Sequence, residues 1–159
     1  MDYKEGNADE LKTKFWKALA DSPFVFLERK EQPGDAVVMT AQLDKEANSE
    51  IWFFTRKDHH LAKMGPAFAT FSSKDHEIFA RFEGVLVEET SRERLEKEWD
   101  RYVEAWFDGK DDPNLLMLRM ELGNAEIWNS DMGLLTNAKM MLGMDVRDEA
   151  GEHHTETAL

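Results

Sequence analysis

An aromatic segment of the sequence runs directly into a cluster of basic residues and histidines. Trp52-Phe53-Phe54-Thr55 is followed by Arg56-Lys57-Asp58-His59-His60. A flavin needs an apolar slot for its planar ring, and cations with hydroxyl groups for its phosphate. A strand that ends in Thr-Arg-Lys offers both within a few residues. A buried strand whose end simply meets solvent would show the same pattern, so both interpretations stay open at this point.

The same region is positive in a chain that is otherwise strongly acidic. The 159 residues contain 20 Lys and Arg against 33 Asp and Glu, which gives a formal net charge of −13. From Arg56 to Arg81 there are five basic and three acidic residues, so this segment carries +2 and the remainder −15. The histidines His59, His60 and His76 lie in it as well. Solvated loops would explain such a run, and so would an anion-binding site.

Other kinds of chemistry find less support in the sequence. His59 and His60 are adjacent and would point in different directions on a strand or a helix, unlike a His-x-x-x-His pair, so no metal site is predicted. The chain has no cysteine, which excludes disulfides, thiolate zinc sites and a Cys nucleophile. Gly-x-Ser-x-Gly and the glycine-rich nucleotide-binding motifs are absent. No side chain is marked as a catalytic acid or base, so the catalytic residues are unknown.

The composition predicts one folded domain with an ordinary core. Hydrophobic residues make up 42% and aromatic residues 11% of the chain, and a chain of roughly 150 residues can bury about 70% of its surface. No apolar run follows the first charged residues, and no stretch has the length of a membrane span. The acidic charge disfavours nucleic acid and anionic membranes as partners. We expect a cytoplasmic protein with one domain over residues 1–144 and a polar, mobile C-terminal tail over 145–159.

Hydrophobic periodicity and turn signals predict the order helix, five strands, helix, two strands, helix. The first helix is expected at about residues 9–20, capped by Asn7. The second begins at a capping box formed by Thr90 and Glu93 and ends near Gly109. A small last helix is expected at residues 133–143. The strands are expected at residues 24–27, 36–42, 50–55, 67–73, 77–87, 115–122 and 124–129.

Short turns between consecutive strands predict antiparallel pairing in a small barrel. Gly84 lies inside one strand and predicts a bulge or a sharp bend at a barrel corner. The strand over residues 50–55 is apolar on both faces and should be covered on both sides. On the second helix, a buried stripe is predicted that consists of Leu95, Trp99, either Tyr102 or Val103, and Trp106, although surplus aromatics could also mark a dimer interface.

Five short segments then follow one another in an order that is typical of a known family. They are Val38-Met39-Thr40, Ile51-Trp52-Phe53-Phe54-Thr55, Gly84, residues 106–113 and Ala125-Glu126-Ile127-Trp128. With them the chain resembles the pyridoxamine 5′-phosphate oxidase-like FMN-binding split barrels, over about residues 11–144, and within these the general stress protein 26 group. The resemblance implies a mainly β fold with flanking helices (α+β), a six-stranded antiparallel split β-barrel. It also implies a homodimer that binds a flavin, FMN or alternatively FAD, at the subunit interface.

The resemblance further implies positions for the cofactor. Along the flavin ring these are Val38, Met39 and Thr40. Near the ribityl phosphate they are Phe54, Thr55, Arg56 and Lys57. A residue of the partner chain, Trp106 or Trp128, would close the site.

The chain departs from the family at one point. The family usually has a Ser-x-Lys pattern shortly after the Thr, and here those positions read His59-His60-Leu61, so that Lys63, Arg56 or Lys57 would have to replace the Lys. A missing charged hydrogen bond weakens binding by about one to two decades. Three functions therefore stay open. The first is a flavin-binding general stress protein, which could be an FMN-dependent oxidoreductase of unknown substrate. The second is a split-barrel dimer that has lost flavin and serves as a ligand-binding or structural module. The third, oxidation of a pyridoxal-type phosphate, would need a second cationic site that the sequence does not display.

Overall fold

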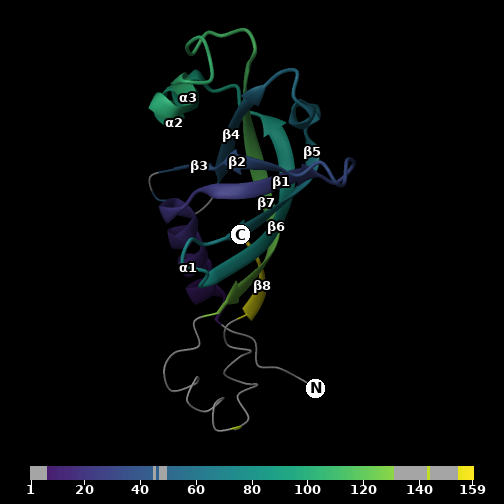
Figure 1. Ribbon diagram of the computed structural model, residues 1–159, viewed down its shortest axis with the longest axis vertical. Coiled ribbons are helices and arrows are strands. Elements are labelled where there is room, and N and C mark those ends of the chain that lie inside the picture. The colour runs from purple at the N-terminus through teal and green to yellow at the C-terminus, as the bar shows by residue number, and fades with distance from the viewer. Residues whose placement is uncertain (1–6, 45, 47–49, 131–142, 144–153) are drawn as a thin grey trace.

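The chain folds around one antiparallel sheet (Figure 1). The computed structural model describes residues 7–44, 46, 50–130, 143 and 154–159. The strands are β1 (Phe24–Arg29), β2 (Val37–Thr40), β3 (Gln42–Leu43), β4 (Ile51–Arg56), β5 (Gly65–Ser72), β6 (Ile78–Glu88), β7 (Leu115–Asn129) and β8 (His154–Ala158). The helices are α1 (Ala8–Asp21), the 3-10 helix η1 (His60–Lys63), α2 (Arg92–Glu98) and α3 (Arg101–Glu104). The strand order is β2-β1-β5-β6-β7-β4-β3, and β8 pairs with β7.

The two ends of this strand order are consecutive in the chain, and this closes the sheet into a barrel. β2 pairs with β1, whereas β3 pairs with β4 at the other end of the order. Only Ala41 separates β2 from β3, and its N–H donates to the carbonyl oxygen of Pro23 at 2.7 Å. The segment Val37–Leu43 is therefore the seam of the barrel. The predicted mainly β fold with flanking helices, an antiparallel split barrel, is confirmed.

The number of strands differs from the expected six because two short ones are added. Six strands, β1, β2, β4, β5, β6 and β7, correspond to the predicted barrel, and the two-residue β3 and the five-residue β8 are added to them. The expected strand over residues 36–42 divides at Ala41, which leaves the two-residue β3. The expected strands over residues 115–122 and 124–129 are one continuous strand, β7.

Gly84 confirms the predicted irregularity in β6. The pairing of β6 with β7 shifts register between Phe82 and Gly84. A Cβ atom at Gly84 would overlap the backbone carbonyl of Glu121 on β7. The absence of a side chain therefore lets the two long strands approach each other where the sheet bends.

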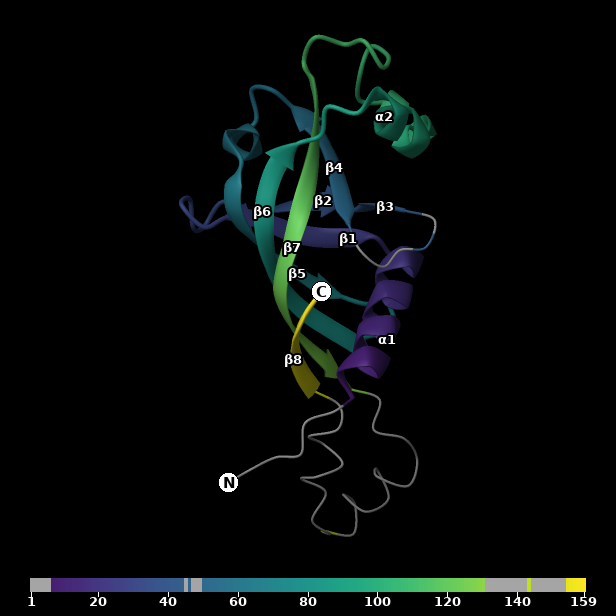
Figure 2. The same ribbon diagram turned by 180° about the vertical axis from the view of Figure 1, so that it is seen from behind.

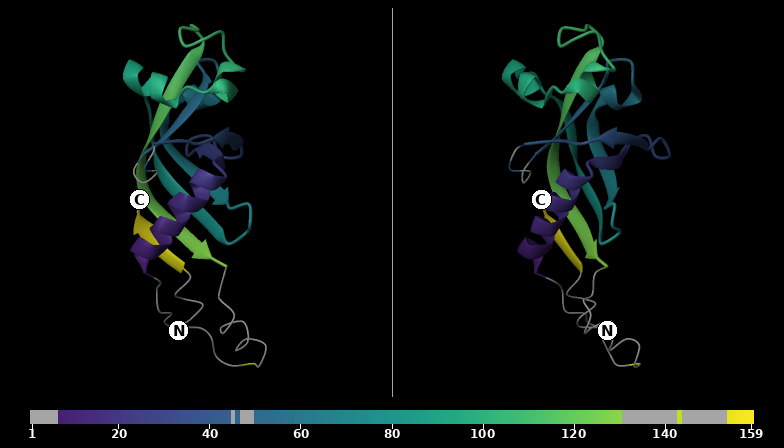
Figure 3. Two further views of the ribbon diagram at one scale, coloured as in Figure 1. Left: turned by 90° about the vertical axis from the view of Figure 1, so that its left-hand side faces the viewer. Right: turned by 60° about the vertical axis from the view of Figure 1, so that its left-hand side comes forward.

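Helix α1 covers the barrel as its apolar periodicity predicts (Figure 3). Asn7 is the N-cap and accepts a hydrogen bond from the backbone N–H of Glu10 at 3.0 Å, as expected. The side chains that α1 buries are Leu11, Phe15, Trp16 and Leu19. The ring of Phe15 contacts Phe71 and Phe82, with ring centroids 6.0 Å and 5.5 Å apart. The core therefore lies between α1 and the inner face of the sheet.

The prediction of one long second helix with a buried stripe is wrong. Residues 92–104 form two short helices, α2 and α3, because the backbone of Trp99 is extended between them. Trp106 is 79% exposed and Tyr102 83%, whereas Val103 is buried, so only part of the expected stripe is covered. Ser91, and not Thr90, is the N-cap, and it accepts from the backbone N–H of Arg94.

The C-terminal residues correct a further expectation. A mobile tail was expected from Asp145, but residues 154–158 form β8 and pair with β7 from Asn124 to Trp128. The small helix expected at 133–143 lies outside the described residues except for Gly143. In the part of the chain that the structure describes, no helix is long and apolar enough to cross a bilayer.

Candidate functional site

Strand β4 carries the aromatic residues of the candidate site and is covered on both faces, as predicted. Ile51, Phe53 and Thr55 are buried on the inner side of the barrel. On the outer side the guanidinium of Arg94 lies 4.2 Å from the ring centroid of Trp52. Helices α2 and α3 lie beside β4 on this side (Figure 2). The outer cover therefore comes from the chain itself.

Further along β4, Phe54 is also covered by a side chain from the segment that follows β6. The ring of Trp99 packs edge-on against Phe54, with centroids 6.0 Å apart. Phe107 extends this aromatic cluster, with its ring 6.5 Å from that of Trp99. Phe54, which the resemblance implies near the phosphate, thus lies under the segment that joins α2 to α3.

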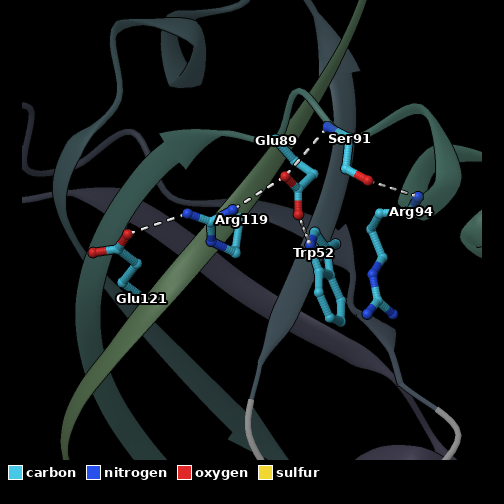
Figure 4. A network of polar contacts seen from close by, with 6 residues as sticks. All are labelled: Trp52, Glu89, Ser91, Arg94, Arg119 and Glu121. Atoms are coloured by element: carbon cyan, nitrogen blue, oxygen red, sulfur yellow. Dashed lines mark hydrogen bonds and ion pairs between the residues drawn. The ribbon is translucent and has the colours of Figure 1, made fainter.

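A polar network fixes β4 to its neighbours, and its centre is Glu89 (Figure 4). The indole Nε1–H of Trp52 donates to one carboxylate oxygen of Glu89 at 3.0 Å. Arg119 on β7 donates to the other oxygen at 3.1 Å. Trp52 is 1% exposed, so its buried N–H would be costly without an acceptor. Glu89 therefore supplies the partner that allows Trp52 to be buried.

The same network sets the charge of Glu89. Burial raises the pKa of Glu89, but hydrogen bonds from Trp52, Ser91 and Arg119 and the charge of Arg119 outweigh burial, and the pKa lies below its ordinary value. The carboxylate is therefore ionised at neutral pH. The sequence does not predict the grouping of Trp52, Glu89 and Arg119, because these three residues are at least 30 positions apart in the chain.

The basic connection, defined as residues 56–63, joins the end of β4 to β5 through η1. Arg56 pairs with Asp58 at 3.2 Å, and both side chains are at least half exposed. The backbone N–H of Lys57 donates to the carbonyl oxygen of Asn114 at 2.9 Å, which holds the connection against the start of β7. Among the described residues, no carboxylate lies within ion-pair distance of Lys57 or Lys63. Both are exposed and available to an anion.

The two histidines of the basic connection lie against each other. Their ring centroids are 4.3 Å apart, with 31° between the planes. Nδ1 of His59 accepts a hydrogen bond from the backbone N–H of Leu61 at 3.1 Å and caps η1. Burial and the neighbouring His60 lower the pKa of His59, and Asp58 opposes this only in part. His59 is therefore neutral at pH 7 when nothing is bound.

Leu61 occupies the position where the resemblance implies a Lys, and the structure shows where its side chain lies. Its side chain is fully buried in the hydrophobic core. Lys63 lies at the end of η1 and has an exposed side chain. The position of Leu61 therefore contributes to packing, and the cations of this region lie on either side of it.

The residues implied along the flavin ring divide between two faces of β2. Val38 and Thr40 point outward, opposite Phe26 and Phe24 on β1. Met39 packs against the core. Phe24, Phe26 and Val38 are 56%, 54% and 59% exposed, and we call them the outer apolar face. Monomers rarely expose large apolar side chains as a cluster.

The seam brings this face towards the end of β4. β3 pairs antiparallel with the first residues of β4, Leu43 with Ile51 and Gln42 with Trp52. β2 precedes β3 and contacts β4 as well. β2 therefore lies on the side of the barrel where β4 runs towards Thr55 and the basic connection.

The two tryptophans implied for the partner chain lie at opposite ends of the molecule (Figures 1 and 2). Trp106 follows α3 at the end where β4 finishes, whereas Trp128 is in the last residues of β7, beside β8. Trp128 is 39% exposed, and its ring lies 5.5 Å from that of His154. One subunit therefore does not bring Trp106 and Trp128 into the same site.

A second cluster of titratable residues lies on the outer face of β6, β7 and β8. Glu126, His154 and Glu156 each place one ligand atom within 4.8 Å of the others, close enough to share a metal ion. Nε2 of His154 is 3.0 Å from a carboxylate oxygen of Glu126. Arg81 donates to the other oxygen of Glu126 at 3.0 Å. The sequence did not indicate this cluster, because it forms only when β8 pairs with β7.

An open groove of about 600 Å³ lies next to this cluster. Its charged lining consists of Arg81, Glu83, Glu126 and Glu156. Glu83 also pairs with Lys30 at 3.0 Å. The lining of the groove is therefore acidic overall, but two of its carboxylates are paired, Glu126 with Arg81 and Glu83 with Lys30.

The comparisons with known proteins agree with the barrel. The model of the family described as pyridoxamine 5′-phosphate oxidase like matches residues 10–150. A solved general stress FMN/FAD binding protein from Xanthomonas citri is 39% identical, with a TM-score of 0.72, over 80% of this chain and 94% of that one. A protein assigned as general stress protein 26 from Jannaschia sp. CCS1 is 30% identical, with a TM-score of 0.79, over 96% of this chain and 100% of that one.

A shorter match links the chain to a curated protein. General stress protein 26 of Bacillus subtilis (strain 168) is 45% identical over 40 residues. This match spans 25% of the present chain and 29% of the Bacillus protein, which is less than a third of its length.

Proposed function

The chain belongs to the pyridoxamine 5′-phosphate oxidase-like family, and on this premise we propose that it is a general stress protein that binds a flavin, FMN in particular. The observation that carries the proposal is the basic connection at the end of β4. In a chain of net charge −13, it presents Lys57 and Lys63 without an ion-pair partner among the described residues. A phosphate monoester is the kind of ligand that such unpaired cations attract. The Xanthomonas citri relative is an FMN/FAD binding protein.

The residues present suit a flavin. Arg56, Lys57 and Lys63 would hold the phosphate, while Val38 and Thr40 on the seam would border the ring from the outer side of the barrel. Bound flavin would supply electron transfer to and from a substrate, and the protein would supply position and electrostatics. An FMN-dependent oxidoreductase activity with an unknown substrate follows as the finer form of this proposal.

A homodimer completes the proposal. The outer apolar face of Phe24, Phe26 and Val38 lies beside the proposed flavin site and is left exposed by the residues that the structure describes. A second copy would cover it, as aromatic residues concentrate in such interfaces. Trp106, which is exposed near the end of β4, would then be available to the flavin of the partner. The substitution Phe26→Glu should shift the protein to a monomer in sedimentation experiments and weaken FMN binding at the same time.

The direct test is a titration of the purified protein with FMN, followed by flavin fluorescence. We expect saturable binding in the micromolar range or below, and a large loss of affinity in Arg56→Ala/Lys57→Ala. The charge-matched control is Lys12→Ala/Lys17→Ala on α1, which removes two cations far from the basic connection in sequence. Loss of affinity in both variants alike would show a general charge effect.

The burial of Leu61 favours a second candidate function, a split-barrel dimer without flavin. This chain has an apolar core residue where the family usually has a cation, so the phosphate site lacks one charge. If FMN does not bind at concentrations of tens of micromolar, this second function replaces the first.

A further inference from the structure

One buried polar atom lacks a partner in the described structure, and it belongs to the basic connection. Nδ1 of His60 is buried and makes no hydrogen bond to any described residue. An unsatisfied buried group of this kind costs about 1–3 kcal/mol. A buried polar group without a partner calls for an explanation, such as a functional role or a bound water molecule or ion.

The histidine pair is also the place where positive charge can be added to the site. His59 uses Nδ1 to cap η1, so its Nε2 is the nitrogen that can carry a proton outward. His60 stacks on it at 4.3 Å. Histidine is the side chain whose charge changes most readily between pH 5 and 8. A dianion beside the pair would favour the protonated rings, whereas the two rings disfavour each other's charge.

Charged groups of both signs lie in the basic connection and in the segments that contact it. The connection itself contributes Arg56, Lys57, Asp58 and Lys63, the loop before β7 contributes Asp112, and the end of β1 contributes Arg29, which pairs with Glu31 just after the strand. Arg29 donates to the carbonyl oxygen of Met64, directly after η1, at 2.7 Å. Asp58 already pairs with Arg56. Asp112 accepts hydrogen bonds from the backbone N–H groups of Asp108 and Asn114. The carboxylates near the pair therefore have other partners.

We propose that His59 and His60 recognise the phosphate of the flavin, and that their protonation supplies the positive charge that Leu61 cannot. The inference rests on the proposed function, since it concerns the same cofactor site. It makes retention of FMN dependent on pH: affinity rises as the pH falls from 8 to 6, and the cofactor is held less tightly in alkaline solution. Riboflavin, which lacks the phosphate, should not show this dependence.

The experiment measures the dissociation constants of FMN and of riboflavin between pH 5.5 and 8.0 by flavin fluorescence. FMN itself changes charge in this range, because the second pKa of a phosphate monoester is about 6. The comparison is therefore made between variants at each pH, where the titration of the ligand cancels. The unchanged protein is compared with His60→Gln, His60→Arg and the control His76→Asn.

The expected results differ among the three variants. At each pH the affinity of the unchanged protein for FMN is divided by the affinity of His60→Gln. This ratio should increase about fivefold to tenfold from pH 8.0 to 6.0, because a charged hydrogen bond stabilises the complex more than a neutral one by about this factor. His60→Arg carries a permanent charge, so it should bind FMN tightly at pH 8.0 and lose most of the pH dependence. His76→Asn changes an exposed histidine outside the basic connection and should behave as the unchanged protein.

Two outcomes would overturn the inference or the proposed function separately. If FMN binds saturably but the ratio between the unchanged protein and His60→Gln is constant with pH, the histidines do not recognise the phosphate and only this inference fails. If neither the unchanged protein nor His60→Arg binds FMN at any pH, the flavin site itself is refuted. A thermal denaturation curve for each variant ensures that a loss of affinity is not a loss of fold.

Discussion

A pair of histidines and a single histidine lie at opposite ends of the barrel and differ in their surroundings. His59 and His60 lie in the basic connection after β4, and His154 lies in β8 (Figure 1). His154 contacts Glu126, which in turn contacts Arg81 across the sheet. At the other end His60 has a buried nitrogen without a described partner. The same residue type therefore joins a network of polar contacts at one end and has a nitrogen without a described partner at the other.

The contrast between the two ends indicates which of them is the better candidate for a ligand site. Arg81 and Glu126 are cross-strand neighbours that the sheet register places opposite each other, so their charges compensate. A connection between strands has no such register, so its charges can stay unpaired for a ligand. We therefore expect substitutions at the β8 end to change stability slightly, and substitutions in the basic connection to change binding strongly.

The largest expected effect is on FMN affinity. Arg56→Ala/Lys57→Ala should raise the dissociation constant of FMN about a hundredfold, because two charged contacts with the phosphate are lost. Arg81→Ala, which removes a cation at the β8 end, should leave it within about twofold. Fluorescence titration at pH 7.0 measures both. An equal loss in the two variants would remove the distinction between the ends.

The next effect is on stability at the end where β4 is fixed. Glu89→Ala should lower the free energy of unfolding by about 1–3 kcal/mol, since the buried N–H of Trp52 and the guanidinium of Arg119 lose their acceptor. Glu89→Gln should cost less, because its amide oxygen can still accept from Trp52. Urea denaturation measures the difference. Equal stability of Glu89→Ala and the unchanged protein would contradict the role of the network.

The pH dependence of this contribution has a definite sign. The pKa of Glu89 is lower in the folded chain than its ordinary value of 4.5. Its contribution is therefore fully present above pH 4.5 and is lost as the pH falls through the lower folded value. Glu89→Gln should lack this part of the acid destabilisation.

A smaller effect is expected at the β8 end. Arg81→Ala should lower the free energy of unfolding by about 0.2–1 kcal/mol, because its ion pair with Glu126 is partly exposed. The loss should shrink at high salt, where the charges are screened. Urea denaturation with and without 1 M NaCl is the measurement. A loss above 2 kcal/mol would mean that β8 depends on this pair.

The smallest expected effect is a shift of apoprotein stability with pH. The pKa of His59 in the folded chain lies below its ordinary value of 6.5, because burial and His60 disfavour its charge. The unfolded chain therefore binds the proton first, and stability falls as the pH decreases through 6.5 towards the folded value. His59→Gln should remove this dependence near neutral pH in urea denaturation. Saturating FMN should oppose it, because the phosphate favours the protonated ring.

The sequence predicted most of the barrel because its signals were local. The spacing of Leu11, Phe15 and Leu19 predicted α1, and Gly84 predicted the bulge opposite Glu121. β8 was missed because a short polar strand such as His154–Ala158 has no apolar alternation, and its partner β7 lies many residues earlier. Periodicity alone cannot show such pairing.

The candidate site was predicted only in part for the same reason. The cationic character of the basic connection is visible in the sequence from Arg56 to Lys63. The acceptor of the Trp52 N–H comes from Glu89, after β6, and Arg119 from β7, so their meeting depends on the closed barrel. The continuous helix expected over Trp99 failed because contact with Phe54 holds that residue in an extended turn.

The seam at Ala41 would link binding of the proposed cofactor to the stability of the closed barrel. β3 is held to β4 through only two paired residues, so this edge should open more easily than the long ladder of β6 and β7. A flavin lying along Val37–Leu43 and reaching the end of β4 would contact both sides of that edge and stabilise its pairing. We expect FMN to slow hydrogen exchange at the amides of this segment more than elsewhere in the chain. The bound cofactor would then stabilise the closed barrel in addition to its chemical role.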